Sequence, residues 1–400
     1  MKKRLFTLGI LGLAWFSGAF LWAQNTGTED VSPGMSRFKK ALKEYTEMVK
    51  EAGNLQQKFL STAVPEEAKE EIGLRLAELS EEVGEVHPRL VKLAERAWLE
   101  QPSEDPELLT FIVQVLEIRL VEDNYEAVYA LLKGLLSGRI PQILPDVYDI
   151  AGETCFMLNQ FEASERFYAK AEKEEVLSEK GEALRKAIPY HRVAWAKEKR
   201  LRDQEATAND LPRVKLETSQ GEMVLELYEN EAPNTVANFI YLAEKGFYDG
   251  TEFFSVVPGL FAEGGRSPMT ADGGPGYTIK DELEHRNARK HFRGTISMTR
   301  SEPDSAGSQF FLSFAPAKEM DGEFVVFGRI VEGMDVLTKL QRVDPANPDP
   351  AAMPDTIVSA EVIRKRDHAY RPKIIRPKKE SDSSQTKKSR KKTGAYGIDN

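Results

Sequence analysis

The spacing of the apolar residues changes once along the chain, at Leu211-Pro212. Over residues 36–208, apolar side chains recur every three or four positions, which is typical of amphipathic helices. After Pro212 they alternate with polar residues, which is typical of half-buried β-strands. A chain of 400 residues has room for about two or three domains, each with its own core. We therefore expect an all-α domain followed by a β domain over 211–365.

The first residues predict export. Three cations follow Met1, and an almost unbroken apolar run then continues to Ala23. A basic start, an apolar stretch and a small residue at its end are typical of a signal peptide over 1–23. The run is also about the shortest that crosses a bilayer as a helix, so a retained membrane anchor stays open. We expect a periplasmic or extracellular protein, with a polar linker over 24–35.

The net charge of −9 is the sum of two unlike parts. Residues 364–400 hold 13 basic and 4 acidic side chains, a net of +9, so residues 1–363 carry −18. Lys, Ser and Pro dominate from residue 366 onward and offer little to bury, which predicts a disordered tail over 366–400. Such a tail either contacts an anionic surface or keeps the chain soluble, and composition alone does not choose between the two.

Two stretches of the helical region resemble each other. Residues 123–127 (DNYEA) and 159–163 (NQFEA) each separate two apolar-periodic helices, with their aromatic residues 36 positions apart. Around the second stretch, small and aromatic residues occupy positions where the tetratricopeptide repeat has them: Ala151, Gly152, Phe161, Tyr168 and Ala171. We expect a tetratricopeptide-like helical array that binds or spaces a protein partner, with a generic helical bundle as the alternative.

Such arrays normally need at least three units. The leading helices, expected over 36–53, 65–84 and 88–100, would then be caps or degenerate repeats. The lone cysteine, Cys155, excludes an intramolecular disulfide and a cysteine zinc cluster, and we expect it to be a buried helical residue.

The β domain starts with a predicted hairpin that turns at Ser219-Gln220-Gly221. A helix that begins at Pro233 and stops at Gly246 follows. Short strands separated by glycine-rich turns come next, with the sequences TEFFSVV, GTISMTR, SQFFLSF, EFVVFGRI and TIVSAEVI. This pattern favours a closed barrel or sandwich of about 150 residues.

Several ordered motifs in this domain resemble one family. They are FYDGTEFFSVVPGLFAEGG, GGPGY, GTISM, GSQFFLSF and MDGEFVVFGRIVEGMDVL. Together they resemble the cyclophilins, the cyclophilin-type peptidyl-prolyl cis-trans isomerases (EC 5.2.1.8 class), over residues 211–365. The resemblance implies a cyclophilin-like β-barrel that accelerates rotation about Xaa-Pro bonds in peptide segments or unfolded proteins. The uncatalysed barrier is about 18–20 kcal/mol, and the family lowers it with neither a metal nor a cofactor.

The resemblance also assigns residues to the site. An apolar socket for the proline ring is implied at Phe253, Phe261, Phe311 and Met320, and Gln309 matches the glutamine that holds the substrate backbone. The implied catalytic positions are Phe253, Ser255, Gln309 and Phe311. The implied substrate-binding positions are Phe261, Glu263, Arg300, Met320 and Phe324.

The chain departs from the family where catalysis depends on charge. Phe254-Ser255 stands where the family has His-Arg, so the usual catalytic cation is missing, and Glu263 stands where glutamine is usual. Losing one preorganised donor costs on the order of 10²- to 10³-fold in rate. One hypothesis is a weakened isomerase in which Arg266 or Arg300 substitutes for the missing cation. The other is an inactive proline-peptide-binding module on a helical adaptor.

Overall fold

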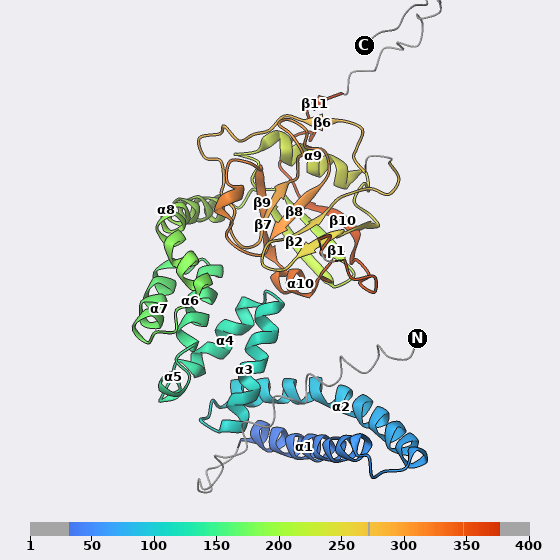
Figure 1. Cartoon of the computed structure of the whole chain (residues 1–400). Helices are drawn as coiled ribbons and strands as arrows, with labels where there is room; N and C mark the ends of the chain where they lie inside the picture. Colours follow the sequence, from blue (N-terminus) through green and yellow to red (C-terminus); the bar gives the residue numbers. More distant parts are fainter. Residues whose placement is uncertain (1–31, 271–272, 347, 377–400) are drawn as a thin grey trace, which may run out of the picture.

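The computed structural model describes residues 32–270, 273–346 and 348–376 (Figure 1). The predicted signal segment, most of the linker and the end of the tail lie outside the described residues. Within the described ranges, no helix is both long and apolar enough to cross a membrane. The described chain consists of a helical half followed by a β domain, as the change in apolar spacing predicts.

The helical half contains eight helices among the described residues. They are α1 (Pro33–Leu60), α2 (Glu66–Glu100), α3 (Pro106–Val121), α4 (Tyr125–Leu135), α5 (Ile140–Ile143), α6 (Val147–Met157), α7 (Phe161–Lys173) and α8 (Glu179–Ala208). The first helix begins before the expected Ser36. Ser32 caps it by accepting a hydrogen bond of 3.2 Å from the Met35 backbone N–H, and Pro33 suits the first helical position.

The helix α2 is continuous where two helices had been expected. Pro88 lies inside it without ending it. Leu90, Val91 and Ala94, just beyond the proline, are buried in the helical core, and this packing outweighs the hydrogen bond that a proline removes. As a result, α1 and α2 form a long antiparallel hairpin that extends away from the other helices (Figure 1).

The two similar stretches form matching turns, one between α3 and α4 and one between α6 and α7. Asp123 and Asn159 occupy the turns in left-handed conformation, with φ of 55° and 60°, which Asp and Asn tolerate better than most residues. Gly152 of α6 faces the Tyr168 ring of α7, and a Cβ atom on this glycine would lie 2.5 Å from that ring. This close approach is consistent with the tetratricopeptide-like prediction.

Cys155 lies on α6 and is 1% exposed, as expected for a buried helical residue. Burial raises the pKa of its thiol to about 11, so the reactive thiolate is disfavoured.

The β domain is a curled sheet with helices at its margins. Its elements are β1 (Arg213–Thr218), β2 (Gly221–Leu227), α9 (Pro233–Glu244), β3 (Thr251–Glu252), β4 (Ser255–Val257), β5 (Phe261–Gly264), β6 (Thr278–Ile279), β7 (Thr295–Met298), β8 (Phe310–Ser313), β9 (Val326–Glu332), α10 (Met334–Lys339), β10 (Thr356–Arg364) and β11 (Ile374–Ile375). A short 3₁₀ helix covers Lys318–Met320. The cyclophilin-like barrel prediction is confirmed, and the hairpin β1–β2 turns where the sequence predicts.

The strand order explains how the sheet curls. In the described residues the main sheet runs β3-β10-β1-β2-β9-β7-β8-β5-β4, with antiparallel neighbours throughout. Its two edge strands, β3 and β4, are separated in sequence only by Phe253 and Phe254. A bridge between Glu252 and Arg266 joins β3 to the chain just beyond β5. The two ends of the sheet therefore meet, and the stretch TEFFSVV forms two short strands rather than one.

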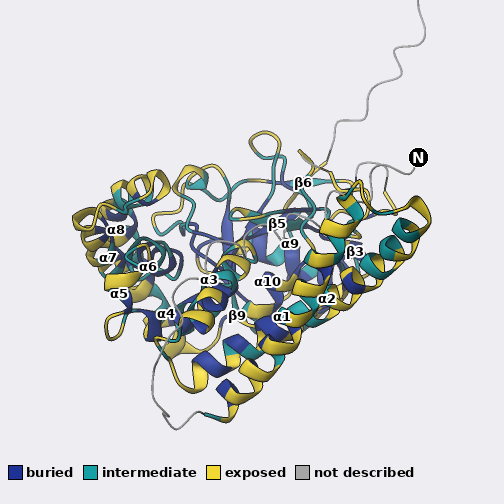
Figure 2. Cartoon of the chain, turned by 60° about the horizontal axis from the view of Figure 1, so that its bottom comes forward, coloured by how far each residue is buried: buried dark blue, intermediate teal, exposed yellow. Residues whose placement is uncertain are grey.

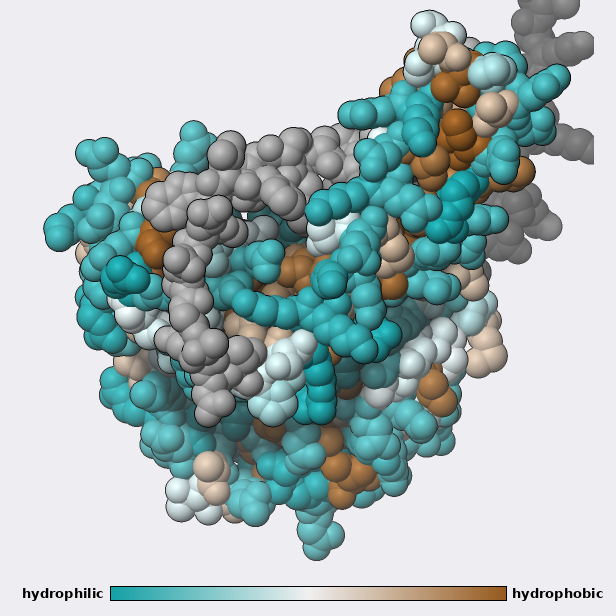
Figure 3. All heavy atoms as spheres, turned by 90° about the horizontal axis from the view of Figure 1, so that it is seen from below, coloured by the Kyte–Doolittle hydropathy of each residue, from teal (hydrophilic) through white to brown (hydrophobic). Residues whose placement is uncertain are grey.

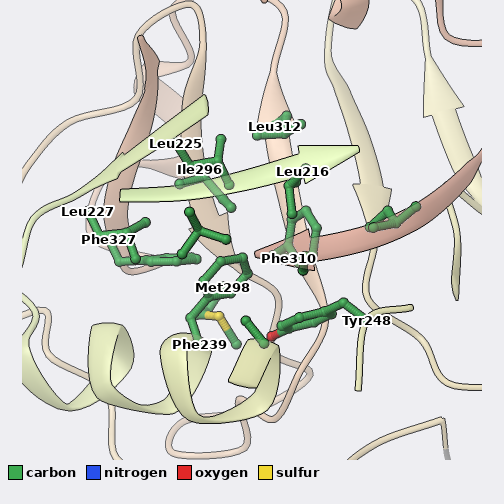
Figure 4. Packing of buried hydrophobic residues seen from close by; sticks show 14 of the residues in the cluster. Leu216, Leu225, Leu227, Phe239, Tyr248, Ile296, Met298, Phe310, Leu312 and Phe327 are labelled. Carbon is green, nitrogen blue, oxygen red and sulfur yellow. The ribbon is translucent and has the colours of Figure 1, made fainter. Parts of the chain in front are cut away.

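Apolar side chains fill the barrel (Figure 4). Phe239 of α9 packs against Phe310 of β8 and Phe327 of β9, with ring centroids 5.6 Å and 5.2 Å apart. Buried residues are concentrated inside both halves, whereas the helices expose their outer faces (Figure 2). The face seen from below is largely hydrophilic, with its apolar side chains in separate small groups (Figure 3).

The ordered chain continues further than predicted. Residues 366–376, which we had assigned to the disordered tail, fold onto the barrel. Tyr370 is 5% exposed and donates a hydrogen bond of 2.7 Å to Glu229, while Arg366 lies 2.9 Å from Asp210. β11 then pairs with β6. A composition averaged over the whole tail does not reveal these contacts, because they depend on single residues such as Tyr370 and Arg366.

A buried arginine joins the two halves. The Arg289 side chain, from the loop before β7, is fully buried and donates hydrogen bonds of 2.8 and 2.9 Å to Glu198 of α8, and it also contacts Glu205. Its guanidinium lies 3.7 Å from the centroid of the Tyr228 ring. Burial alone would raise the pKa of Glu198, but Arg289 and Arg202 hold it down to about 2. The charges on both sides of this interface are therefore matched.

We expect Arg289→Met to destabilise the protein by about 3–5 kcal/mol, because it removes the fully buried cation that Glu198 and Glu205 share. Within the described part of the chain, Glu198 then keeps only Arg202 as an ion-pair partner, at 2.7 Å. Glu205 keeps only the more distant Arg329 there, at 3.8 Å. The midpoint of urea unfolding would measure the loss.

Lys186→Met is the matched control, because it removes an exposed i,i+4 pair with Glu182 and should cost under about 1 kcal/mol. Equal losses in the two variants would contradict a structural role for Arg289.

Candidate functional site

Strand register brings four side chains into one row on the outer face of the sheet. Ser255 on β4 pairs with Glu263 on β5, Glu263 pairs with Phe311 on β8, and Phe311 pairs with Ser297 on β7. Directly paired residues of antiparallel strands point to the same face. Phe261 lies two residues before Glu263 and shares this face. Three positions that the sequence assigned to the site, Phe261, Glu263 and Phe311, thus share the face that carries Ser255.

Aromatic rings form the centre of this site. Phe311 lies 5.7 Å from Phe261 and 5.4 Å from Phe324, measured between ring centroids, and meets Phe324 edge to face. Phe311 is 4% exposed, whereas Phe261 and Phe324 are half-buried. The Phe324 backbone N–H donates a hydrogen bond of 3.3 Å to the carbonyl of Met320, which holds these two predicted residues in one turn. We call Phe261, Phe311, Phe324 and Met320 the aromatic socket.

Gln309 stands beside the aromatic socket. It precedes β8, two residues before Phe311, and is half-buried. Its backbone carbonyl accepts a hydrogen bond of 2.9 Å from the Thr299 N–H, which fixes the main chain at this point. With strand alternation its side chain falls on the face that carries Phe311.

Phe253 does not belong to the socket. It is fully buried and packs in the barrel core, close to Gly264 on β5. The reason is the break between β3 and β4, which lies at Phe253-Phe254 and sets the phase of the strand alternation. The ring therefore supports the site from within the barrel, which corrects its assignment as a socket residue.

The two candidate substitute cations are engaged elsewhere or lie at the surface. Arg300 lies 2.5 Å from Asp281 and 3.5 Å from Glu323, and its Nε–H donates to the Glu323 carbonyl. Arg266 is exposed, with its guanidinium 5.9 Å from the Phe254 ring. Among the described contacts, neither guanidinium meets a residue of the aromatic socket.

Comparison with known proteins identifies the domain. The family profile described as cyclophilin type peptidyl-prolyl cis-trans isomerase/CLD matches residues 213–362. A peptidyl-prolyl cis-trans isomerase of Helicobacter pylori is 46% identical over 131 residues, which are 32% of this chain and 80% of that protein. Peptidyl-prolyl cis-trans isomerase B of Bacillus subtilis is 44% identical over 119 residues, 30% of this chain and 82% of that protein. The chain belongs to the cyclophilin family.

The solved structures that are similar to this chain include a cyclophilin. A Cryptosporidium parvum cyclophilin, solved in the presence of the dipeptide Ala-Pro, is 26% identical, with a TM-score of 0.34; the match covers 38% of this chain and 98% of that one. The family profile and the two bacterial relatives confirm the predicted family, and the enzyme class named for these relatives is that of the peptidyl-prolyl cis-trans isomerases.

The cyclophilin domain carries an acid at the centre of the row. Glu263 is half-buried between Ser255 and Phe311, and burial raises the pKa of its carboxyl group. No lysine or arginine in the described part of the chain forms an ion pair with it. When protonated, this carboxyl group offers one donor and one acceptor. It then offers a donor beside an acceptor, as the amide usual at this position does, but with one donor hydrogen fewer.

Two residues near the aromatic socket were not assigned to the site from the sequence. His291 stacks on Phe311, with ring centroids 5.8 Å apart and planes inclined by 8°. Leu260, next to Phe261, is 50% exposed, and its carbonyl accepts a hydrogen bond of 2.9 Å from the Phe314 N–H. His291 and Phe311 are on separate elements, so spacing in the sequence gives no signal of their contact. Leu260 could have been found from its place beside an assigned residue.

The Glu263 carboxyl group should make the stability of the fold depend on pH. Its raised pKa means that the native state binds more protons than the unfolded state, once the pH exceeds the unfolded value of about 4.3. Wild-type stability therefore falls as the pH rises through this window. In Glu263→Gln the dependence disappears, so the variant should gain stability over wild type at pH 8 and lose that advantage at pH 4.

The midpoints of urea unfolding at the two pH values measure this difference. Glu252→Gln, at an exposed position on β3, is the matched control, and its urea midpoint should equal that of wild type at both pH values. A Glu263→Gln variant whose offset from wild type is the same at pH 4 and pH 8 would contradict the prediction.

Proposed function

We propose that this protein is a peptidyl-prolyl cis-trans isomerase of weakened activity that assists the folding of exported proteins. The observation that carries the proposal is the aromatic socket beside Gln309, with Ser255 rather than a cation at the end of the row. Its substrates are proline-containing segments of unfolded proteins.

The socket residues suit the rotation of an Xaa-Pro bond. The bond resists rotation because amide resonance is lost in the twisted state, which has less charge on the carbonyl oxygen. An apolar surface that removes water from the proline ring and from the carbonyl of the residue before it favours that less polar state. In the proposed mode, Phe311 lies against the proline ring, Phe261 and Phe324 flank it, and Gln309 binds the backbone on one side.

The weakened isomerase activity follows from the residue that would face the prolyl nitrogen of the substrate, Ser255. As resonance is lost, this nitrogen becomes a hydrogen-bond acceptor, and a preorganised donor there stabilises the transition state. Ser255 is 6% exposed and its side chain is short, so it does not extend across the socket as a guanidinium would. Desolvation and backbone binding remain as the means of catalysis.

A second candidate function has its own supporting observation. Because the usual cation is absent and Arg300 is held by Asp281, the domain also suits binding of a proline segment without turnover. In that case the helical half would be an adaptor that carries the binding domain to a partner. Exchange NMR on an Ala-Pro-containing peptide distinguishes the two, because it measures both binding and the isomerisation rate.

We expect Ser255→Arg to raise the isomerisation rate on the order of a hundredfold, the lower end of what one preorganised donor contributes, because it restores one donor to the transition state. Glu263, its cross-strand partner, would hold the new guanidinium over the socket. Exchange NMR at equal enzyme concentration gives the rate. Ser359→Arg, on β10, is the matched control and should leave the rate unchanged.

Circular dichroism and the urea midpoint establish that Ser255→Arg is folded. A folded variant that binds the peptide as wild type does, without faster exchange, would show that the missing cation is not what limits the rate.

Phe311→Ala tests the socket separately and should lower both peptide affinity and rate at least tenfold, as expected for loss of a central aromatic contact.

Export and the remaining partners are proposed from the sequence alone. The basic and apolar start supports secretion, the repeated helix pairs support a protein partner, and the net charge of the last residues supports contact with an anionic surface. In a host that secretes the protein, N-terminal sequencing of the extracytoplasmic product should begin at Gln24. A product that retains Met1 in the membrane fraction would instead establish the anchor.

A further inference from the structure

The helical half contacts the loop that carries Met320. Tyr190 of α8 donates a hydrogen bond of 2.6 Å from its hydroxyl to Oδ2 of Asp321, the residue after Met320. Lys318 of the same loop lies over the Tyr190 ring, 4.9 Å from its centroid. The loop has only a single 3₁₀ turn, Lys318–Met320, so its place depends on such contacts.

The contact continues from the Asp321 carboxylate to the centre of the aromatic socket. Oδ1 of Asp321 accepts a hydrogen bond of 2.8 Å from the His291 backbone N–H and lies 2.9 Å from His291 Nδ1. The His291 side chain is fully buried and stacks on Phe311. Tyr190 is thus linked to the central socket ring through two side chains, each in direct contact with the next.

A second contact holds the turn that leads into Phe261. Asp123, in the turn between α3 and α4, accepts hydrogen bonds of 3.0 and 3.1 Å from the Gly259 backbone N–H. Gly259 lies in the turn that leads into Phe261, with a φ of 72° that favours glycine. Arg342 lies 3.1 Å from the same carboxylate and fixes its position. Two of the three segments that carry socket residues, the turn before Phe261 and the turn over residues 320–324, are therefore attached to the helical half.

We propose that Tyr190 is a positioning residue for the aromatic socket, so that the helical half is part of the isomerase unit and not only a carrier for it. The inference rests on the proposed function. Binding and catalysis require side chains to be held close to the productive geometry, and residues behind the site supply that constraint. Tyr190 acts through Asp321, which fixes both His291 and the turn that contains Met320.

The test is Tyr190→Phe in the full chain, which removes one hydroxyl and keeps the ring beneath Lys318. We expect kcat/KM for an Ala-Pro peptide to fall about tenfold, in line with the loss of a hydrogen bond to a charged group. Tyr148→Phe is the matched control, because Tyr148 lies on α6 and contacts Lys170 within the helical half. It should leave kcat/KM unchanged.

Amide hydrogen exchange supplies a readout that a merely structural role would not change. If Tyr190 couples the helix to the socket, peptide binding must protect α8 around residue 190, since linkage between two sites is reciprocal. We expect this peptide-dependent protection in wild type and Tyr148→Phe, and its loss in Tyr190→Phe. If the wild-type protein binds the peptide without turnover, the peptide Kd replaces kcat/KM as the measured quantity. Tyr190→Phe should then raise this Kd by a similar factor.

The experiment distinguishes a failure of the proposed function from a failure of the positioning role of Tyr190. A wild type that neither binds nor isomerises the peptide overturns the proposed function and this inference with it. If the wild-type protein is functional and Tyr190→Phe has the same kcat/KM and the same peptide-dependent exchange, the inference alone is overturned. A slower Tyr190→Phe with a parallel drop in the urea midpoint and unchanged peptide-dependent exchange also overturns it, because the hydroxyl would then serve stability only.

Discussion

The buried charge of Arg289 is the constraint on which the arrangement of the two halves depends. Its guanidinium lies between Glu198 and Glu205 of α8 and over the ring of Tyr228 in the barrel. Removing one partner of such a group leaves an uncompensated charge, so separation of the halves is costly. α8 is thereby fixed along the barrel, and Tyr190 on the same helix is brought within reach of the socket loop. The site geometry follows from an interface outside the site.

The fold could be predicted from the sequence where the signal is local. The alternation around Ser219-Gln220-Gly221 gives the hairpin, and the proline-started segment gives α9. The aromatic socket could be assigned because its motifs resemble one family. The resemblance assigned Phe253 to the socket, but the strand breaks at Phe253-Phe254 where the barrel closes, and Phe253 points into the core. That break depends on both edges of the sheet and not on the local residues.

The contacts between the halves could not be predicted in this way. Tyr190 and Asp321 are 131 residues apart, and either would pass as an ordinary surface residue in a periodicity analysis. The same holds for Arg300, whose sequence position suggests a free cation while Asp281 already pairs with it. Ion pairs and hydrogen bonds depend on where elements pack, and apolar periodicity indicates only which face of an element is buried.

A slow isomerase gains from a rigid connection to a second binding region. If the helical array holds a client, as we propose, the proline segment meets the socket at an effective concentration that reaches the millimolar range for short connections. The rate per encounter then matters less than the frequency of encounters, which would offset part of the loss of activity that we propose at Ser255. The advantage requires that the two halves keep a fixed geometry, because a loosely attached socket would lose it. Arg289 and Tyr190 hold the two halves in this geometry, at opposite ends of one contact surface along α8.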